Sequence, residues 1–416
     1  MGTNTLNTIK SNGGVLAKLA AGTLADNLQF GKSISQADPN DYNGKNGYSA
    51  GDTIYISKPA IMSTNSSFDA TSSMQSIQEQ KVALALDIIS SVPIDLDSQE
   101  LASTINIKSI YDRAIKPAVI AIATDVEKTM LTRAMYQTSN IVGTAGSTVF
   151  DPDTMLSAGQ KLNEFLAPMD GERYALLSPA AQRSAINARK GFPNASDEVS
   201  NQYKRGLMGE ADGFVYMANN LLPRLTSGTA TGSITVTTTS VAGATTIALT
   251  GTGTQTLTAG QTFTVASCNA VHPQTKVDLG YLKQFVISAN NTASGGAYTG
   301  VALGGEPIYT ATSGSLQNIT RFPTASDVVT LGAGIGNTAS ATYTQNIVYH
   351  KDAFRMVSVP LVMPEAVELA VQETYKGYTV AIVRAFDVLK RRMITRVDFL
   401  GGFCATRPEW ACRISS

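Results

Sequence analysis

Histidine and cysteine are scarce in this 416-residue chain, and their scarcity excludes several kinds of site. The only histidines are His272 and His350, and because a zinc site needs three or four ligands, the sequence predicts no metal centre. The three cysteines form no metal-binding or redox motif, and their odd number excludes a complete disulfide framework; they are Cys268, Cys404 and Cys412. A reducing cytoplasm fits this usage.

Charge is scarce as well. Charged residues make up only 15% of the chain, whereas about a quarter is usual. Lys and Arg number 32 and Asp and Glu number 32, so no net field draws the protein onto nucleic acid or an anionic membrane. Since 43% of the residues are hydrophobic, we expect much of the surface outside the core to be covered, most simply by a partner subunit.

Targeting and catalytic motifs are also missing. The first residues, MGTNTLNTIK, lack the charged and apolar regions of a signal peptide. The apolar run Ala118–Ala123 is far too short to cross a bilayer. There is no GxSxG, P-loop, HExxH or dinucleotide-binding glycine motif. The sequence therefore predicts no catalytic, cofactor-binding or metal-binding residues, and we expect no enzyme.

Three short patterns resemble functional motifs but are explained better as structure. The glycines of LGAGIGNT, residues 331–338, lack the Lys-Ser/Thr ending of a phosphate-binding loop, so a β-turn is favoured. The basic run Lys390–Arg392 could touch a phosphate backbone, yet such a short run usually forms a solvated strand face. Asp95 and Asp97 share a face if the chain is extended there, but no base or nucleophile pairs with them.

The chain is organised around Ser109–Gln137, which has the pattern of one long amphipathic helix. Large apolar residues recur every three or four positions and so share a face; they are Ile115, Val119, Ile122, Val126 and Met130. The charged residues are expected to stay solvated; they are Arg113, Lys116, Asp125, Glu127, Lys128 and Arg133. Pro117 removes a helical hydrogen bond, so the helix either bends or begins there.

Two segments precede this helix. Residues 1–35 predict an arm, in which Leu16, Leu19 and Leu24 form the apolar face of a short helix behind a flexible Gly13-Gly14 opening. Such a helix has too little surface to fold alone, so it should dock on a neighbouring subunit or on its own domain. Next, two β segments near residues 53–57 and 81–88 flank a polar stretch and predict a long extended loop, with Asn-Gly turns within residues 43–47.

After the helix, Asp151-Pro152 has the pattern of a helix start, and the next apolar residues share one face; they are Met155, Ala158, Leu162 and Phe165. A short buried strand at Arg173–Pro179 and a helix at Ala180–Lys190 follow. At about Thr226 the composition changes to Thr, Gly, Ala and Ser.

Residues 226–345 of this threonine-rich region contain only six charges, Lys276, Asp278, Lys283, Glu306, Arg321 and Asp327. Segments of alternating Val, Ile and Phe predict a small antiparallel β-barrel or sandwich rather than disorder. Because the earlier composition returns afterwards, we expect an insertion. The chain then ends with predicted strands near residues 355–359, 378–384, 390–399 and 403–414, the last three returning to the sheet of the first half.

Four stretches resemble the major capsid (coat) protein of tailed double-stranded DNA bacteriophages, in the short-tailed-phage type with an inserted β-domain. GDTIYISKP (Gly51–Pro59) resembles a strand of that family's extended loop, and IYDRAIKPAVIAIATDVEKTML resembles its spine helix. RYALLSPAAQ, YKRG and GEADGFVYMANNLLP resemble its apical domain. AFRMVSVPL and the ending RVDFLGGFCATRPEWACRI resemble its last strands, with an R-x-D-x-L-x-G pattern at Arg396, Asp398, Leu400 and Gly402.

This resemblance covers essentially the whole chain in order and implies an α+β, Hong Kong 97-type capsid fold with an inserted all-β domain. The implied parts are an N-terminal arm (1–35), an extended loop with flanking strands (36–90), a peripheral domain with the spine helix (91–150), the first part of an apical domain (151–225), an inserted β-barrel-like domain (226–345) and return strands (346–416). Of these, the insertion is least like anything specific.

The resemblance implies a structural protein that self-assembles into the icosahedral head of a tailed phage and encloses packaged double-stranded DNA. It implies hexameric and pentameric capsomers, assembly in the host cytoplasm with a scaffolding protein and a portal, a possible decoration protein and non-specific DNA contact, with no cofactor or membrane. An encapsulin-like compartment shell has the same fold class. A threonine-rich adhesin would explain the insertion but not the spine helix.

Overall fold

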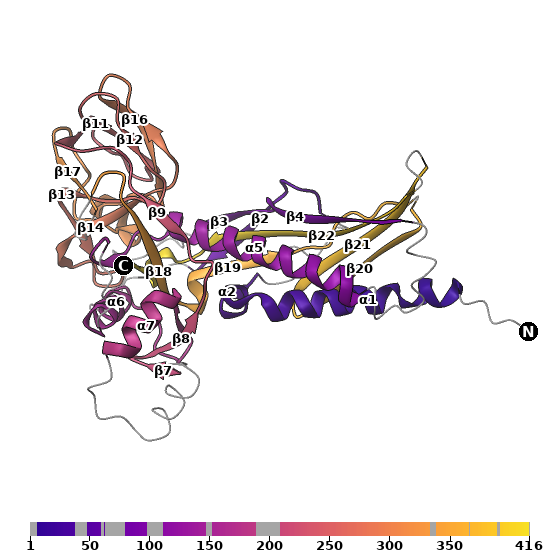
Figure 1. The fold of residues 1–416 in the computed structure, drawn as a ribbon. Helices are drawn as coiled ribbons and strands as arrows, with labels where there is room; N and C mark the ends of the chain where they lie inside the picture. Colours follow the sequence, from indigo (N-terminus) through magenta and orange to yellow (C-terminus); the bar gives the residue numbers. More distant parts are fainter. Residues whose placement is uncertain are drawn as a thin grey trace, which may run out of the picture. The chain divides into compact units, whose positions relative to one another are not determined.

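The computed structural model describes residues 6–37, 48–59, 62, 80–97, 111–146, 152–188, 209–332, 338–365, 367–388 and 392–415. The chain forms two compact units. The first comprises Met1–Ile56, Lys81–Met130 and Arg355–Cys404, and the second comprises Ser57–Gln80, Leu131–Phe354 and Ala405–Ser416. Within the described parts, strands dominate and few helices occur, and no helix is long and apolar enough to span a membrane (Figure 1).

The first unit is built on a six-stranded sheet in the order β1-β19-β22-β21-β20, with β4 also paired to β22. The strands are β1 (Ser35–Gln36), β4 (Ile88–Asp97), β19 (Phe354–Ser358), β20 (Leu369–Tyr375), β21 (Tyr378–Asp387) and β22 (Arg392–Ala405). Lys376 and Gly377 join β20 to β21 with φ of 50° and 81°. Positive φ at both turn residues matches the twist of a tight hairpin, and so fixes its register.

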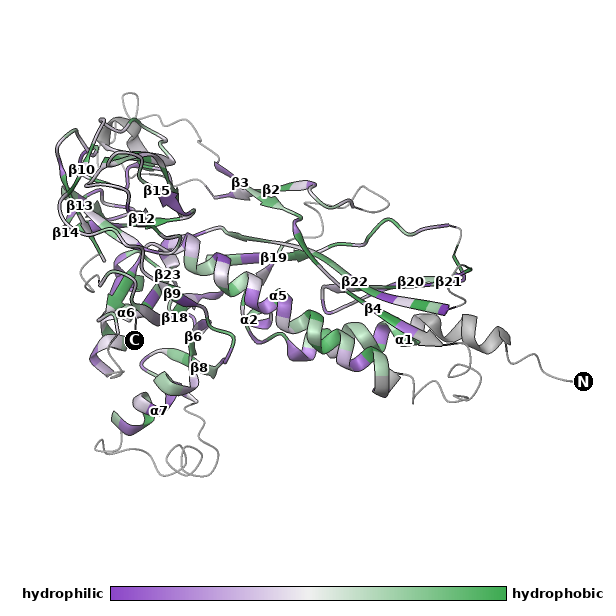
Figure 2. Cartoon of the chain, turned by 45° about the horizontal axis from the view of Figure 1, so that its top comes forward, coloured by the Kyte–Doolittle hydropathy of each residue, from purple (hydrophilic) through white to green (hydrophobic). Residues whose placement is uncertain are grey.

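Helix α5 (Lys116–Gln137) follows a π-helical turn, η2 (Tyr111–Ile115), so the α-helix begins at Lys116, one residue before Pro117, in line with the predicted start there. The predicted apolar stripe is confirmed, because all five of its side chains are at most 1% exposed. Hydrophobic and hydrophilic colours alternate along α5 in Figure 2. Glu127 contradicts the prediction that the charged residues stay solvated. It is only 2% exposed, because its carboxylate accepts hydrogen bonds from the backbone of α2 (Gln29–Ser33).

Helix α1 (Leu6–Asn27) packs against β20 and β21 of the same chain. It runs straight through Gly13-Gly14, so the predicted flexible opening is wrong; two glycines cost a long helix only about 1 kcal/mol each. The predicted apolar face is also only partly right. Leu24 is fully buried and Leu16 half-buried, whereas Leu19 is 51% exposed because small alanines supply most of the buried face.

Strands β2 (Thr53–Lys58) and β3 (Gln80–Ala85) pair as a two-stranded ribbon. Exposed and buried residues alternate along β2, as the period-two pattern predicts. Ile54 and Ile56 pack with Leu84, Val357 and Leu400 in one apolar cluster of the first unit. The predicted Asn-Gly turns, the tip between these strands and residues 98–110 lie outside the described residues.

The second unit contains a seven-stranded sheet in the order β5-β23-β18-β6-β8-β7, with β9 paired to β18. Its strands are β5 (Ile141–Gly143), β6 (Arg173–Leu177), β7 (Glu210–Ala211), β8 (Phe214–Ala218), β9 (Arg224–Thr226), β18 (Thr342–His350) and β23 (Ala411–Ser415). Helices α6 (Pro152–Glu164) and α7 (Pro179–Ala188) complete its core. The predicted apolar face of α6 is confirmed, since all four of its residues are at most 4% exposed.

The threonine-rich region forms a closed barrel in the order β10-β11-β16-β14-β13-β17 (Figure 1). The strands are β10 (Ile234–Val236), β11 (Thr246–Thr250), β13 (Thr262–Val271), β14 (Asp278–Ile287), β16 (Ala297–Gly304) and β17 (Val328–Leu331), with a separate pair β12 (Thr256–Leu257) and β15 (Asn291–Thr292). Inward-facing apolar residues such as Ile234, Phe263 and Tyr298 fill the barrel. Short 3₁₀ turns complete the unit: η3 (Ala311–Leu316), η4 (Lys351–Ala353) and η5 (Pro408–Trp410).

The predicted pairing of the last segment is partly wrong. β22 runs through Gly401-Gly402 instead of turning there, and β23 pairs in the sheet of the second unit. A Cβ at Gly402 would lie 2.6 Å from the carbonyl oxygen of Ala85, so this glycine serves close packing rather than a turn. The prediction also missed β20, whose residues are mostly half-buried and show no clear apolar alternation.

Candidate functional site

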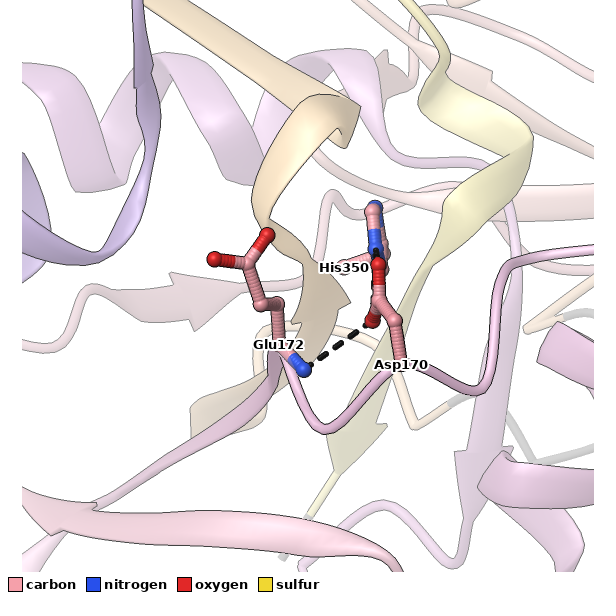
Figure 3. A group of neighbouring side chains, drawn as sticks. All are labelled: Asp170, Glu172 and His350. Atoms are coloured by element: carbon pink, nitrogen blue, oxygen red, sulfur yellow. Dashed lines mark hydrogen bonds and ion pairs between the residues drawn. The ribbon is translucent and has the colours of Figure 1, made fainter.

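One histidine lies among carboxylates, at Asp170, Glu172 and His350 (Figure 3). His350 is 1% exposed; its Nε2 lies 3.1 Å from Asp170 Oδ2, and its Nδ1 accepts a hydrogen bond from Asp352 N. Both ring nitrogens are thus occupied. The hydrogen bond donated by Glu172 N, followed by that from His350, holds the pKa of Asp170 below its ordinary value.

Glu172 completes the group without turning it into a metal or catalytic site. Its carboxylate accepts a hydrogen bond from Lys351 Nζ at 2.9 Å, and Figure 3 draws no bond from it to His350 or to Asp170. A metal ligand would need a free lone pair on His350, yet Asp352 N already donates to Nδ1 and Nε2 donates to Asp170. These contacts therefore tie the loop before β6 to the end of β18.

The second cluster is ionic and joins three segments that are distant in sequence. Lys58 Nζ, at the end of β2, lies 2.5 Å from Glu306 Oε1, which follows β16, and 3.4 Å from Glu409 Oε1 in η5. The Lys58 side chain is 6% exposed, and those of Glu306 and Glu409 are 25% and 11% exposed. Lys283 on β14 and Arg407 before η5 also face this cluster.

The two carboxylates of this cluster differ in proton affinity. For Glu306, burial would raise the pKa, but attraction to Lys58 and Lys283 outweighs it and lowers the pKa to about 2. For Glu409, burial and repulsion by Glu306 outweigh attraction to Lys58 and raise the pKa to about 7. Burial would likewise lower the pKa of Lys58, but the two glutamates raise it above its ordinary value. Because the two glutamates share one lysine and repel each other, their pKa values move in opposite directions.

Side-chain hydrogen bonds also join the barrel to the neighbouring sheet, from both sides. The Gln284 amide accepts from Ile141 N at 2.9 Å and donates to Ile141 O at 3.0 Å, which imitates a strand partner at the edge of β5. Arg413, fully buried on β23, donates from Nη1 to Gly260 O at 2.7 Å, and burial lowers its pKa to about 10. These contacts attach the barrel to its own unit.

All six charges of the threonine-rich region make such internal contacts. Lys276 donates to the carbonyls of Ser315 and Gln317, and Asp278 accepts from Asn269. Arg321 pairs with Asp327 at 2.8 Å, and Lys283 lies 5.1 Å over the ring of Phe165. With Glu306 in the ionic cluster, each of the six has an internal partner, although Asp278 itself is exposed.

The other sequence candidates are structural or lie outside the description. His272 caps a turn, because its Nδ1 accepts from Thr275 N. Arg392 forms an ion pair with Asp95. Lys390, Arg391 and residues 333–337 of the glycine-rich pattern are outside the described residues. All three cysteines are buried, and none of them forms a disulfide.

Sequence reasoning did not single out Lys58, Glu306 or Glu409 as a group. A signal existed for Glu306, because an ionised residue in a charge-poor region needs a partner when it is buried. Its partner Lys58 lies 248 residues away, which no spacing rule reveals.

Within the described residues, the polar side chains of these clusters hold strands and loops together. A scan against models of protein families matches residues 1–413 to the family described as "P22 coat protein - gene protein 5". The chain therefore belongs to this coat protein family, and it is a structural major capsid protein of a tailed phage.

Several solved structures are similar to this chain over most of its length. That of Mycobacterium phage Che8 has a TM-score of 0.47, with 12% identity over 92% of this chain and 90% of that one. The capsid of Ralstonia phage GP4 has a TM-score of 0.46, with 7% identity over 92% and 87%. The capsid of cyanophage P-SCSP1u has a TM-score of 0.43, with 12% identity over 89% and 84%. No curated protein matches the chain.

Proposed function

We propose that copies of this chain assemble into the icosahedral head of the phage as subunits of the Hong Kong 97 type, arranged in hexameric and pentameric capsomers around packaged double-stranded DNA. The observation that carries the proposal is the family match over residues 1–413. The long helix α5, the sheet with long strands and the β2–β3 ribbon are the parts that such a subunit requires. A two-stranded ribbon is marginally stable alone, so contact with a neighbouring subunit would suit it.

The proposed subunit has the six parts named from the sequence, with residues 226–345 as the inserted domain. The closed barrel supports this assignment, and β9 and β18, which pair at Thr226 and Thr342, would form its stem. β18 then continues to His350 in the sheet of the second unit, beyond the proposed end of the insertion at residue 345.

The proposed partners follow from the same family. We infer that a scaffolding protein and a portal take part in assembly in the host cytoplasm, that a decoration protein can bind outside, and that DNA is contacted without sequence preference. Equal numbers of acidic and basic residues suit weak DNA contact. We propose no catalytic activity and no cofactor.

The test is expression of the full chain with and without the scaffolding protein, followed by sedimentation and electron microscopy. Closed shells that depend on the scaffolding protein are expected. Monomers or dimers alone under both conditions would contradict the proposal. Shells from infected cells that hold a protein cargo instead of DNA would favour the compartment shell.

A further inference from the structure

Glu409 occupies an unusual position in the ionic cluster of Lys58, Glu306 and Glu409. Its Oε1 shares Lys58 with Glu306, while its Oε2 is buried and has no hydrogen-bond partner. An ionised carboxylate with an unpartnered buried oxygen costs far more than a neutral one. The cluster therefore accommodates one negative charge on Glu306 much better than a second on Glu409.

We propose that Lys58, Glu306 and Glu409 form a proton-operated latch, which holds the end of β2 to the barrel and to η5 when Glu409 is protonated and loosens when Glu409 ionises. The latch lies within the second unit, since all three residues belong to it. A neutral Glu409 leaves Lys58 to Glu306 alone, whereas an ionised Glu409 repels Glu306 and competes for the same ammonium group.

Charged groups on the elements packed against Glu409 decide whether its carboxyl group is protonated. Lys58 faces it from β2, Lys283 from β14 and Arg407 from its own turn, and Glu306 faces it from the loop after β16. The guanidinium of Arg407 is also engaged by the Trp410 ring, at 4.4 Å from the ring centroid. Burial lowers the pKa of Lys283, so this second cation of the cluster holds its proton less strongly than a solvated lysine does.

The direction of the pH effect follows from the two glutamates. The pKa of Glu409 is raised from 4.5 to about 7, so its contribution to stability is fully present below 4.5 and is lost as pH rises through about 7. The pKa of Glu306 is lowered, so its contribution is present above 4.5 and is lost only in acid. Across neutral pH, Glu409 alone changes state in this pair, and the latch loosens as the pH rises.

Trp410 reports on this latch directly. It is the only tryptophan in the chain, it follows Glu409, and its Nε1 donates to Phe165 O at 3.0 Å. The full-length protein is titrated across neutral pH while tryptophan fluorescence is recorded. A transition with a midpoint near 7 is expected, and Glu409→Gln, which imitates the protonated acid, should abolish it.

His350 must be distinguished from Glu409, because its ring also contacts that of Trp410, at 5.4 Å between the ring centroids. The control variant is Asp170→Asn, which removes the carboxylate that His350 contacts on a side chain 45% exposed. The Glu409 transition should keep its midpoint in this variant. A midpoint that moves in Asp170→Asn and persists in Glu409→Gln would assign the transition to His350 and overturn the latch.

Amide exchange in β2 and β3 gives a second readout. At one pH above the transition, these strands should exchange at least about tenfold more slowly in Glu409→Gln than in the unaltered protein, because a full pKa unit corresponds to a factor of ten. When Lys58→Met is also present, Glu409→Gln should no longer change the rate of amide exchange in β2 and β3. Equal exchange in Glu409→Gln and the unaltered protein would refute the proposal.

Discussion

Glu127 is the side chain whose removal should reveal most about the first unit. Its carboxylate accepts from Gln29 N at 2.8 Å and from Phe30 N at 3.2 Å, and Leu28, which precedes α2, supplies no side-chain cap. Glu127 thus satisfies the first backbone N–H groups of α2 from another helix. Hydrogen bonds to a charged group contribute about 1.5 to 3 kcal/mol each, but α2 can partly fray toward water. We expect Glu127→Ala to cost about 2 to 4 kcal/mol and Glu127→Gln about half as much.

The assay is amide exchange of Gln29 and Phe30 in the full chain, together with denaturant unfolding followed by circular dichroism. The expected loss corresponds to a fall in protection of about thirty-fold to several hundred-fold, since each 1.4 kcal/mol is a factor of ten. The matched control is Asp112→Ala, which removes an exposed carboxylate near the start of α5 and should change stability by less than about 0.5 kcal/mol. If protection at Gln29 and Phe30 is unchanged in Glu127→Ala, the capping argument is wrong.

Three further substitutions test the packing. Val126→Asp buries an unpaired carboxylate and should cost several kcal/mol and prevent soluble expression, whereas Ile120→Asp, at a position 39% exposed on the same helix, should be tolerated. Gly304→Ala places a Cβ 1.9 Å from a backbone oxygen in the last turn of α5 and should lower the melting temperature, at a cost of about 1 to 3 kcal/mol; an unchanged melt would show that the barrel shifts freely. Leu24→Ala should cost the monomer about 2 to 5 kcal/mol and Leu19→Ala almost nothing, and the reverse order on unfolding would mean that α1 packs differently.

These leucines revise the expectation for the N-terminal arm. Deleting residues 1–28 removes Leu24 and Leu28, both fully buried, so the melting temperature of the monomer should fall. In the unaltered chain, Leu19 is 51% exposed, and a neighbouring subunit could cover it. A defect in assembly without a change in monomer stability in Leu19→Ala would therefore separate the two roles, which deletion of the whole arm cannot do.

Periodicity predicted the elements whose partners are the general apolar interior. The stripe of α5, the face of α6 and the alternation of β2 all follow from spacing, because any apolar surface of the right width satisfies them. Glu127 could not be placed in this way. Its position on α5 is compatible with solvent, and only the approach of α2, 98 residues earlier, turns it inward.

The same limit explains the misread glycines at residues 401 and 402. A Gly-Gly pair is a common turn signal, and nothing local distinguishes it from a strand that needs close packing. The contact that decides, between Gly402 and the carbonyl oxygen of Ala85, joins strands more than three hundred residues apart in the chain. As a result, the predicted break between strands 390–399 and 403–414 was wrong, because β22 runs on to Ala405.

Charge in a charge-poor region carries information that periodicity does not. In the threonine-rich region, threonine and glycine already keep the surface polar, so an ionised side chain is not needed for solubility there. Each of its six charges instead makes an internal contact: two hold turns, two pair with each other, and Lys283 and Glu306 face the cluster that contains Lys58. Because a buried charge without a partner is costly, Lys283, which is buried, and Glu306, which is half-buried, each predict a partner of opposite sign. Sequence alone predicts that these partners exist, and the fold is required to name them.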